Sequence, residues 1–258
     1  MSRNVFHVSP QYQPLMRVVG LDAETIFSHP QIVVWRKLAD RENCTLDAEF
    51  DGRRVRLHVK RYTSTAPAQD EVKGIELLQS AGIPTVPLVG WGTIAGGRSF
   101  VMTEDLQGYA AADKALAAGL PFASILEPTA DLAAKLHRAE LHHRDLYLCH
   151  FFVRAGQPED VRLIDPARVA KLSGLFRNRW IVKDLAQFWY STLPLPVTDA
   201  QRDQWLRRYG GEKMKAAILR KVRAIARHDA KLKRNQPTRN ISIPGAPNTG
   251  ETPVPRET

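Results

Sequence analysis

Two aspartates, Asp145 and Asp165, occupy positions at which carboxylates could support phosphoryl transfer. Asp145 ends the triplet His143-Arg144-Asp145, which an apolar run follows, and Asp165 ends the short string Leu163-Ile164-Asp165. In such chemistry the first carboxylate accepts or orients the proton of an attacking hydroxyl, and the second holds a magnesium ion that bridges nucleotide phosphates. The triplet alone is weak evidence, because a turn between a helix and a strand often carries solvated polar residues.

The elements around the two aspartates predict that they meet. Short apolar strands are expected at Phe151–Val153 and at Val161–Ile164, with a turn over residues 156–160 between them. A hairpin of this kind places Asp145 and Asp165 at the same open end. The helix expected over residues 122–139 has an apolar stripe, so it forms the buried centre of a helical lobe.

A lysine and a glutamate upstream could complete the site. Cys44–Phe50 and Arg54–Lys60 alternate in polarity, and Asp51-Gly52 between them is a strong signal for a two-residue hairpin. A helix over residues 68–81, closed by Gly82, carries Glu71 on the face of Leu78. Glu71 could pair with Lys60, which would then reach nucleotide phosphates. The alternatives are an exposed lysine on a half-polar strand and a glutamate that complements the helix dipole.

Two further strands, over residues 84–92 and 98–102, are joined by a Gly96-Gly97 turn. The chain then becomes helical, so a hinge between a sheet lobe and a helical lobe is expected near Met102 and Glu104, which we assign to nucleotide binding. The sequence thus predicts an α+β fold with a small antiparallel-sheet N-lobe and a mainly helical C-lobe. The expected ranges are an irregular lead-in over 1–28, the N-lobe over 29–103, the C-lobe over 104–235 and a disordered tail over 236–258.

The amino-acid composition limits the kinds of molecule that the protein is expected to bind. The 258 residues carry a net charge of +10, which favours anionic partners. Residues 212–234 form an expected helix with nine basic and two acidic residues, either a solvated terminal helix or a surface for anionic lipid or acceptor phosphates. The two cysteines, Cys44 and Cys149, are too few and too far apart for a disulfide scaffold or a zinc module. No leader or membrane span is recognisable, so we expect a cytoplasmic protein, either free or peripheral to the inner membrane.

The string from His143 to Phe151, together with Leu163-Ile164-Asp165, Arg168 and the later Lys183-Asp184-Leu185-Ala186, resembles the Kdo/WaaP (InaA-type) lipopolysaccharide kinase family. The resemblance runs from about Lys60 to about Tyr209. His150 supports it, since general kinases have asparagine at this place.

The resemblance implies a bilobal protein-kinase-like fold, ATP with Mg²⁺, and phosphorylation of a heptose or Kdo hydroxyl in the lipopolysaccharide inner core. Lys60 would hold the nucleotide phosphates and Glu71 would fix Lys60. Asp145 would be the catalytic base and Asp165 the metal ligand. His150 would either neighbour the metal or phosphate or orient Asp145, since a neutral imidazole is a softer ligand than Mg²⁺ usually takes. Asp184 is expected to be structural and to hold the catalytic loop.

Two features depart from ordinary protein kinases. No Gly-x-Gly-x-x-Gly motif occurs between Ile32 and Phe50, so another loop, near Asp40 to Cys44, would cover the phosphates. Pro166-Ala167 follows Asp165 where protein kinases have Phe-Gly, which argues against a mobile switch at the metal site.

Three functions stay open from the sequence. The favoured one is an ATP-dependent kinase of a lipopolysaccharide core sugar or a related glycolipid. A protein Ser/Thr or Tyr kinase is the second, and the missing glycine loop counts against it. A nucleotide-binding pseudokinase scaffold is the third, although a scaffold has no need of Lys60, Glu71, Asp145 and Asp165 together. Nucleic-acid binding ranks last, because the basic terminal helix carries no aromatic residue.

Overall fold

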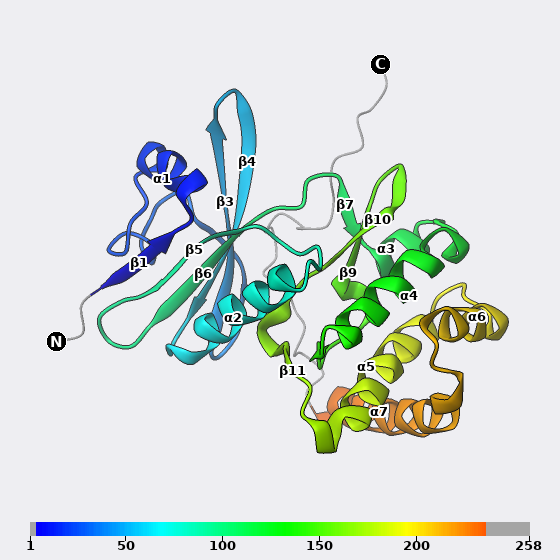
Figure 1. Cartoon of the computed structure of the whole chain (residues 1–258). Coiled ribbons are helices and arrows are strands. Elements are labelled where there is room, and N and C mark those ends of the chain that lie inside the picture. Colours follow the sequence, from blue (N-terminus) through cyan, green and yellow to red (C-terminus); the bar gives the residue numbers. More distant parts are fainter. Residues whose placement is uncertain (1–3, 236–258) are drawn as a thin grey trace. The chain divides into compact units, whose positions relative to one another are not determined.

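The computed structural model describes residues 4–235, which divide into two compact units (Figure 1). The first unit holds the described chain up to Ile75 together with Val86–Gln107, and the second holds Glu76–Thr85 and the described chain from Gly108 onward. The tail expected to be disordered, residues 236–258, lies outside the described residues.

The first unit is built on a six-stranded sheet in the order β1-β5-β6-β4-β3-β2, with every neighbouring pair antiparallel. The strands are β1 (Val5–Val8), β2 (Val33–Lys37), β3 (Arg41–Phe50), β4 (Arg53–Tyr62), β5 (Leu88–Thr93) and β6 (Ser99–Glu104). The predicted hairpin is confirmed: β3 and β4 pair from Arg41↔Tyr62 to Phe50↔Arg53. Asp51 and Gly52 both have positive φ, 50° and 70°, as a tight turn between twisted strands requires.

The N-terminal segment differs from the prediction. An irregular lead-in was expected over residues 1–28, but β1 pairs with β5 and helix α1 (Gln13–Val19) buries Leu15 and Met16 in the core of the sheet. These elements are too short to show periodicity, so their structure depends on contacts with distant strands. Ser9, for example, donates its backbone N–H to the carbonyl of Val89.

Helix α2 (Ala66–Ser80) confirms the predicted helix and its end. Glu71, Ile75 and Leu78 are all buried, so the three residues expected on one face do share it. Gly82 follows the helix at φ 64°, a conformation that glycine adopts without steric cost. The described chain then enters β5 after Pro84.

The second unit is mainly helical. Its helices are α3 (Ala112–Ala117), α4 (Phe122–Arg138), α5 (Arg177–Thr192), α6 (Asp199–Tyr209) and α7 (Lys215–Asn235). A small sheet has the order β10-β9-β7, from β7 (Tyr109–Ala111), β9 (Phe151–Arg154) and β10 (Gln157–Leu163), and β8 (Leu141–His142) pairs with β11 (Ala170–Lys171). The predicted α+β class, an antiparallel sheet followed by a mainly helical part, is confirmed.

The core of the second unit centres on α4, α5 and α6. Ile125 and Leu136 of α4 are fully buried, as predicted for a central helix. The rings of Phe188 and Trp205 stack at 3.9 Å between centroids, and the indole N–H of Trp205 donates to Thr129. This stacked pair fixes α6 against α5 and α4, and α5 carries the residues that position the site described below.

The basic C-terminal segment is divided, unlike the single helix expected over residues 212–234. A short 3₁₀ turn, Glu212–Met214, precedes α7, whose Ile218 and Val222 are buried in the core. Within residues 4–235, no helix is both long enough and apolar enough to cross a membrane.

Gly92 allows β1 to approach β5, and its replacement tests this contact. A Cβ at Gly92 would lie 2.0 Å from the carbonyl oxygen of Val5 and 2.8 Å from the ring of Phe100. We expect Gly92→Ala to lower the free energy of unfolding by about 1–3 kcal/mol, because the added methyl overpacks the sheet. Denaturant titration measures this change. Gly174→Ala is the control, since nothing lies within 4 Å of a Cβ there, and equal stability of the two variants would contradict the prediction.

Candidate active site

The catalytic loop, residues 143–150, is held by one buried carboxylate. Asp184 of α5 is fully buried and accepts hydrogen bonds from the backbone N–H of His143 at 2.7 Å and of Arg144 at 2.8 Å. Arg144 has φ 68°, a left-handed conformation that costs a non-glycine residue free energy. The two hydrogen bonds offset this cost, so the expectation that Asp184 is structural and holds the loop is confirmed.

Other side chains of α5 continue along the same loop. Gln187 accepts from the backbone N–H of Leu146 at 3.1 Å, and Ser191 accepts from that of Leu148 at 2.9 Å. Lys183 donates to the carbonyl of Arg144 at 2.6 Å. These four polar residues of one helix, Lys183, Asp184, Gln187 and Ser191, set the loop's path, and only Asp184 was assigned this role from the sequence.

Asp145 points its carboxylate at a cation of the same unit. Nη1 of Arg168 lies 3.1 Å and 3.2 Å from its two carboxylate oxygens, and Gln187 donates to Oδ1 at 3.4 Å. Arg168 belongs to the 3₁₀ turn Pro166–Arg168 that follows Asp165. The turn therefore links the two aspartates: Asp165 directly precedes it, and its last residue, Arg168, binds Asp145.

Asp165 has a strained backbone and an accessible side chain. Its φ and ψ are both 55°, a left-handed conformation, and 38% of its side chain is exposed. Nε2 of His150 lies 3.8 Å from Oδ2 of Asp165. The backbone N–H of Ile164 donates to the carbonyl of His150 at 3.0 Å, so the hairpin of β9 and β10 brings the ends of both loops together as predicted.

His150 is a partly buried hydrogen-bonding residue between the two aspartates. Its Nδ1 lies 2.6 Å from the backbone carbonyl of Asp145, and therefore carries a proton and donates. Burial opposes the charge on the ring, but Cys149, the Asp165 carboxylate and the Asp145 carbonyl together raise the pKa of His150 to about 9. These contacts support the orienting role of His150, and its role as a metal ligand stays a prediction.

Metal binding depends on what a nucleotide would add. No three His, Cys, Asp or Glu side chains converge to hold a metal ion within residues 4–235. Mg²⁺ commonly binds through one or two carboxylates and completes its shell with substrate phosphates and water. One accessible carboxylate at Asp165 fits this kind of binding and does not fit a closed, all-protein metal site.

Lys60 and Glu71 form the expected ion pair within the first unit. Nζ of Lys60 lies 2.7 Å from Oε1 of Glu71, and the hydroxyl of Tyr62 donates to the other carboxylate oxygen at 2.7 Å. Only 3% of the Glu71 side chain is exposed, compared with 24% of Lys60. Burial and the neighbouring Glu71 charge raise the pKa of Tyr62, so its hydroxyl keeps its proton and donates. Glu71 is thus fixed from two sides and Lys60 stays accessible.

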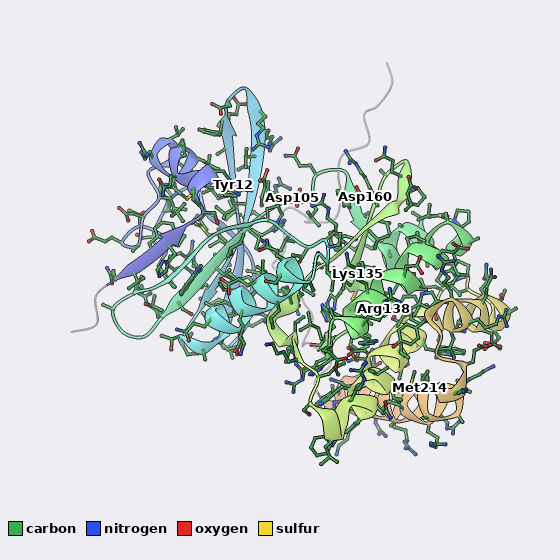
Figure 2. The ribbon with its side chains drawn as sticks, in the orientation of Figure 1. Tyr12, Asp105, Lys135, Arg138, Asp160 and Met214 are labelled. Atoms are coloured by element: carbon green, nitrogen blue, oxygen red, sulfur yellow. The ribbon has the colours of Figure 1, made fainter. Side chains whose placement is uncertain are left out.

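The residues assigned to the hinge have other partners. Met102 is fully buried in the core of the sheet, and Glu104 binds the hydroxyl of Tyr12 and, at 3.3 Å, the guanidinium of Arg53 (Figure 2 labels Tyr12). Neither side chain therefore points freely into solvent. Their assignment to nucleotide binding stays a prediction.

The loop proposed to cover the phosphates is shorter than expected. Arg41–Cys44 belong to strand β3, so the connection between β2 and β3 is only Leu38-Ala39-Asp40. The register Asn43↔Lys60 shows that this turn lies at the same end of the sheet as Lys60. Sequence reasoning placed the loop too late because the short strand β2 gave no alternating pattern.

The fold and these two groups of residues define a phosphotransferase of the protein-kinase-like class. A family model described as the lipopolysaccharide kinase (Kdo/WaaP) family matches residues 52–209. The chain belongs to this lipopolysaccharide kinase family. The prediction of a kinase with an alcohol group as acceptor is thereby confirmed, and membership of a kinase family implies the use of ATP.

Individual relatives support the assignment to this family. The chain is 30% identical over 230 residues to the lipopolysaccharide core heptose(I) kinase WaaP of Pseudomonas aeruginosa, which covers 77% of this chain and 81% of the relative. The enzyme of the same name from Escherichia coli K12 is 29% identical over 154 residues, 54% of this chain and 57% of the relative. Among solved structures, WaaP in complex with acyl carrier protein matches with a TM-score of 0.65 at 26% identity, covering 87% of this chain and 98% of that one.

Asp184→Asn tests how far the loop depends on a carboxylate. Asparagine offers one acceptor oxygen, so one of the two loop N–H groups would face an amide N–H₂ group inside the protein. We expect the free energy of unfolding to fall by about 1–3 kcal/mol. Asp131→Asn is the control, because Asp131 is half exposed in its pair with Arg208 and such pairs contribute about 1 kcal/mol or less. Denaturant titration of both variants should separate them, and similar losses would argue against the role of Asp184.

Proposed function

We propose that this protein transfers the γ-phosphoryl group of ATP, with Mg²⁺, to a sugar hydroxyl of the lipopolysaccharide inner core, a heptose in the first instance. One observation carries the proposal: Asp165 directly precedes the short turn Pro166–Arg168, and Arg168 at the end of that turn binds the carboxylate of Asp145, whose loop is held by the buried Asp184. The family and the relatives' names support the sugar acceptor.

Asp145 would act as the base. Its carboxylate is partly exposed, with 27% of the side chain accessible, and would accept or orient the proton of the acceptor hydroxyl. Arg168 holds both carboxylate oxygens, so the acceptor must displace or share this contact. His150 would keep the carbonyl of Asp145 in place through its 2.6 Å hydrogen bond.

Asp165 and Lys60 would bind the nucleotide. Asp165 would hold the Mg²⁺ ion, which when bound neutralises negative charge on the phosphates. Lys60, fixed by Glu71, presents a partly exposed ammonium group suited to phosphate oxygens. The turn Leu38-Ala39-Asp40, with no glycine, would take the place of a glycine-rich loop.

Two features favour a sugar acceptor over a protein. The segment from Asp165 to α5 is short and includes β11 paired with β8, so it leaves little chain for a phosphorylation-controlled loop. His150 holds the position that is asparagine in general kinases.

A structural relative was solved in complex with acyl carrier protein, so a carrier of this kind is a candidate partner here as well. We place the enzyme in the cytoplasm, at the face of the inner membrane.

The decisive experiment is phosphate transfer from labelled ATP to dephosphorylated lipopolysaccharide core, with a panel of proteins offered in parallel. We expect label in the glycolipid, and a fall in rate of about three orders of magnitude in Asp145→Asn, since that variant lacks the base. Asp131→Asn is the matched control and should retain full activity. Label in protein alone would favour a protein kinase, and ATP binding with no transfer would favour a scaffold.

Glu71→Gln tests the fixing of Lys60. The amide keeps the size of Glu71 but loses the charge that pairs with Lys60, a contact for which a charge-assisted bond contributes about 1.5–3 kcal/mol. We expect kcat/KM for ATP to fall about 10-fold to 100-fold. Steady-state kinetics at varied ATP measures this change. Glu76→Gln, an exposed residue of the same helix, should behave like the unchanged protein, and an equal effect of both would contradict the role of Glu71.

A further inference from the structure

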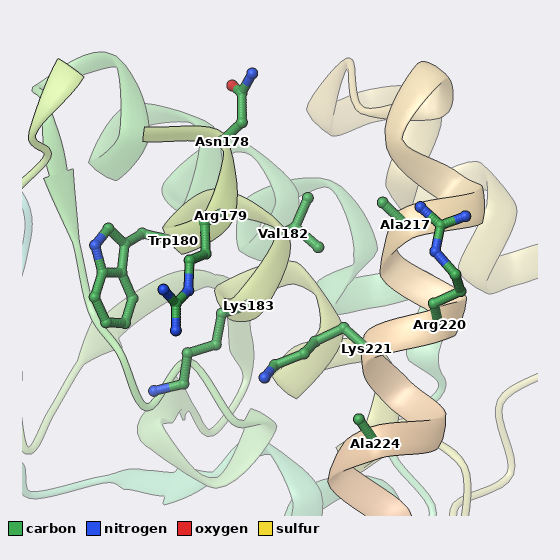
Figure 3. Close-up of a pocket in the computed structure, with 9 residues that line it drawn as sticks. All are labelled: Asn178, Arg179, Trp180, Val182, Lys183, Ala217, Arg220, Lys221 and Ala224. Carbon is green, nitrogen blue, oxygen red and sulfur yellow. The ribbon is translucent and has the colours of Figure 1, made fainter. Parts of the chain in front are cut away.

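A groove between α5 and α7 is basic (Figure 3). One of its lining residues, Lys183, donates to the carbonyl of Arg144 in the catalytic loop. The groove has a volume of about 650 Å³, and four of its nine lining residues are cationic while none is acidic. Small apolar side chains separate the cations. The lining residues are Asn178, Arg179, Trp180, Val182, Lys183, Ala217, Arg220, Lys221 and Ala224.

Three of the four cations in the groove form no ion pair with a carboxylate in the part of the chain that the structure describes. Among residues 4–235, no carboxylate lies within ion-pair distance of Arg179, Arg220 or Lys221. Arg179 instead lies 5.7 Å from the centroid of the Trp180 ring. Unpaired cations in a concave surface attract anions more strongly than the same charges on a flat one. The groove is therefore suited to phosphate groups.

An exposed apolar tip stands at the start of the same helix. The 3₁₀ turn Gly174–Phe176 leads directly into α5, and 90% of Leu175 and 49% of Phe176 are exposed. Leu175 is the most exposed large hydrophobic residue among those described. A single exposed leucine needs no explanation. Two successive exposed apolar residues next to a basic groove, however, combine apolar attraction with electrostatic attraction for the same ligand. Amphipathic membrane-surface elements share this combination.

We propose that the tip, Leu175-Phe176, and the groove cations Arg179, Arg220 and Lys221 form one face that binds the surface of an anionic phospholipid bilayer. The two apolar side chains enter the headgroup region, and the cations bind lipid phosphates. We favour a bilayer as the occupant, because protruding apolar side chains next to a cluster of cations are the combination by which amphipathic elements bind an anionic membrane surface.

The groove contacts the catalytic loop, so membrane binding would bring the acceptor to the site. This step rests on the proposed function. Lys183, which lines the groove, donates to the carbonyl of Arg144, the residue before Asp145. Arg144 also stacks over the Trp180 ring at 4.8 Å. A glycolipid acceptor in the bound bilayer would thus be presented beside the catalytic base.

Vesicle flotation of the purified full chain tests the proposal, with phosphatidylcholine alone or with about one-third phosphatidylglycerol. We expect binding to the anionic vesicles, weakened by salt. Arg220→Gln with Lys221→Gln should weaken it about 25-fold, at about fivefold per cation. Leu175→Ser with Phe176→Ser should weaken it on the order of tenfold, with little change in salt dependence.

Matched controls remove the same chemistry elsewhere. Lys73→Gln with Lys114→Gln removes two exposed cations, and Leu193→Ser removes a leucine that is 45% exposed. Both should bind vesicles like the unchanged protein. Vesicle binding equal to wild type in the tip and groove variants would overturn the proposal. So would loss of acyl carrier protein binding with vesicle binding intact, which would assign the face to a protein partner.

The two proposals can fail separately. Flotation needs neither ATP nor acceptor, so it stands or falls without any phosphate transfer. With a detergent-free, lipid-free core oligosaccharide as acceptor, the tip and groove variants should transfer phosphate at the wild-type rate. Their rate should fall only with glycolipid embedded in vesicles.

Discussion

A negative charge buried without solvent, on Asp184, is the constraint from which the site follows. An ionised carboxylate in the interior must be compensated by hydrogen bonds. Here the N–H groups of His143 and Arg144 supply two, and His137 lies 3.3 Å away. The loop makes these hydrogen bonds with Arg144 in a left-handed conformation. The direction of Asp145, the next residue, is therefore decided inside the helical core and not at the surface.

A cation lies beside each of the three candidate carboxylates in its own unit. Glu71 has Lys60, Asp145 has Arg168 and Asp165 has His150. The three pairs differ in burial: the Glu71 side chain is 3% exposed, that of Asp145 27% and that of Asp165 38%. The most buried carboxylate has a structural task, because water and ligands cannot reach it. We propose that the two accessible carboxylates exchange their protein cation for a substrate or an ion.

Sequence patterns predicted the elements whose structure depends on interactions between residues close together in the chain. The sequence predicted three of these elements, because turn residues and periodicity act over a few positions. They are the β3–β4 hairpin, α2 with its terminal glycine, and the buried α4. The catalytic loop was readable from its unusual string of residues. What the sequence did not show depends on contacts between distant segments, such as Tyr12 with Glu104, 92 positions apart. The same reason explains why the sequence did not predict β1, α1 or the loop-binding role of Lys183, Gln187 and Ser191 in α5. Pattern also cannot tell that Leu175 is exposed, because hydrophobicity alone predicts burial.

The pairing of β1 with β5 and of β3 with β4 bears on how the protein can be shortened. The region that resembles the family, residues 52–209, begins inside the turn between β3 and β4 and stops before α7. A chain trimmed to it would lose three of the six strands and expose Leu57 and Val59, which are fully buried. It would also uncover the core beneath Ile218 and Val222. Resemblance and folding unit have different borders here, and truncation must follow the hydrogen bonds of the sheet.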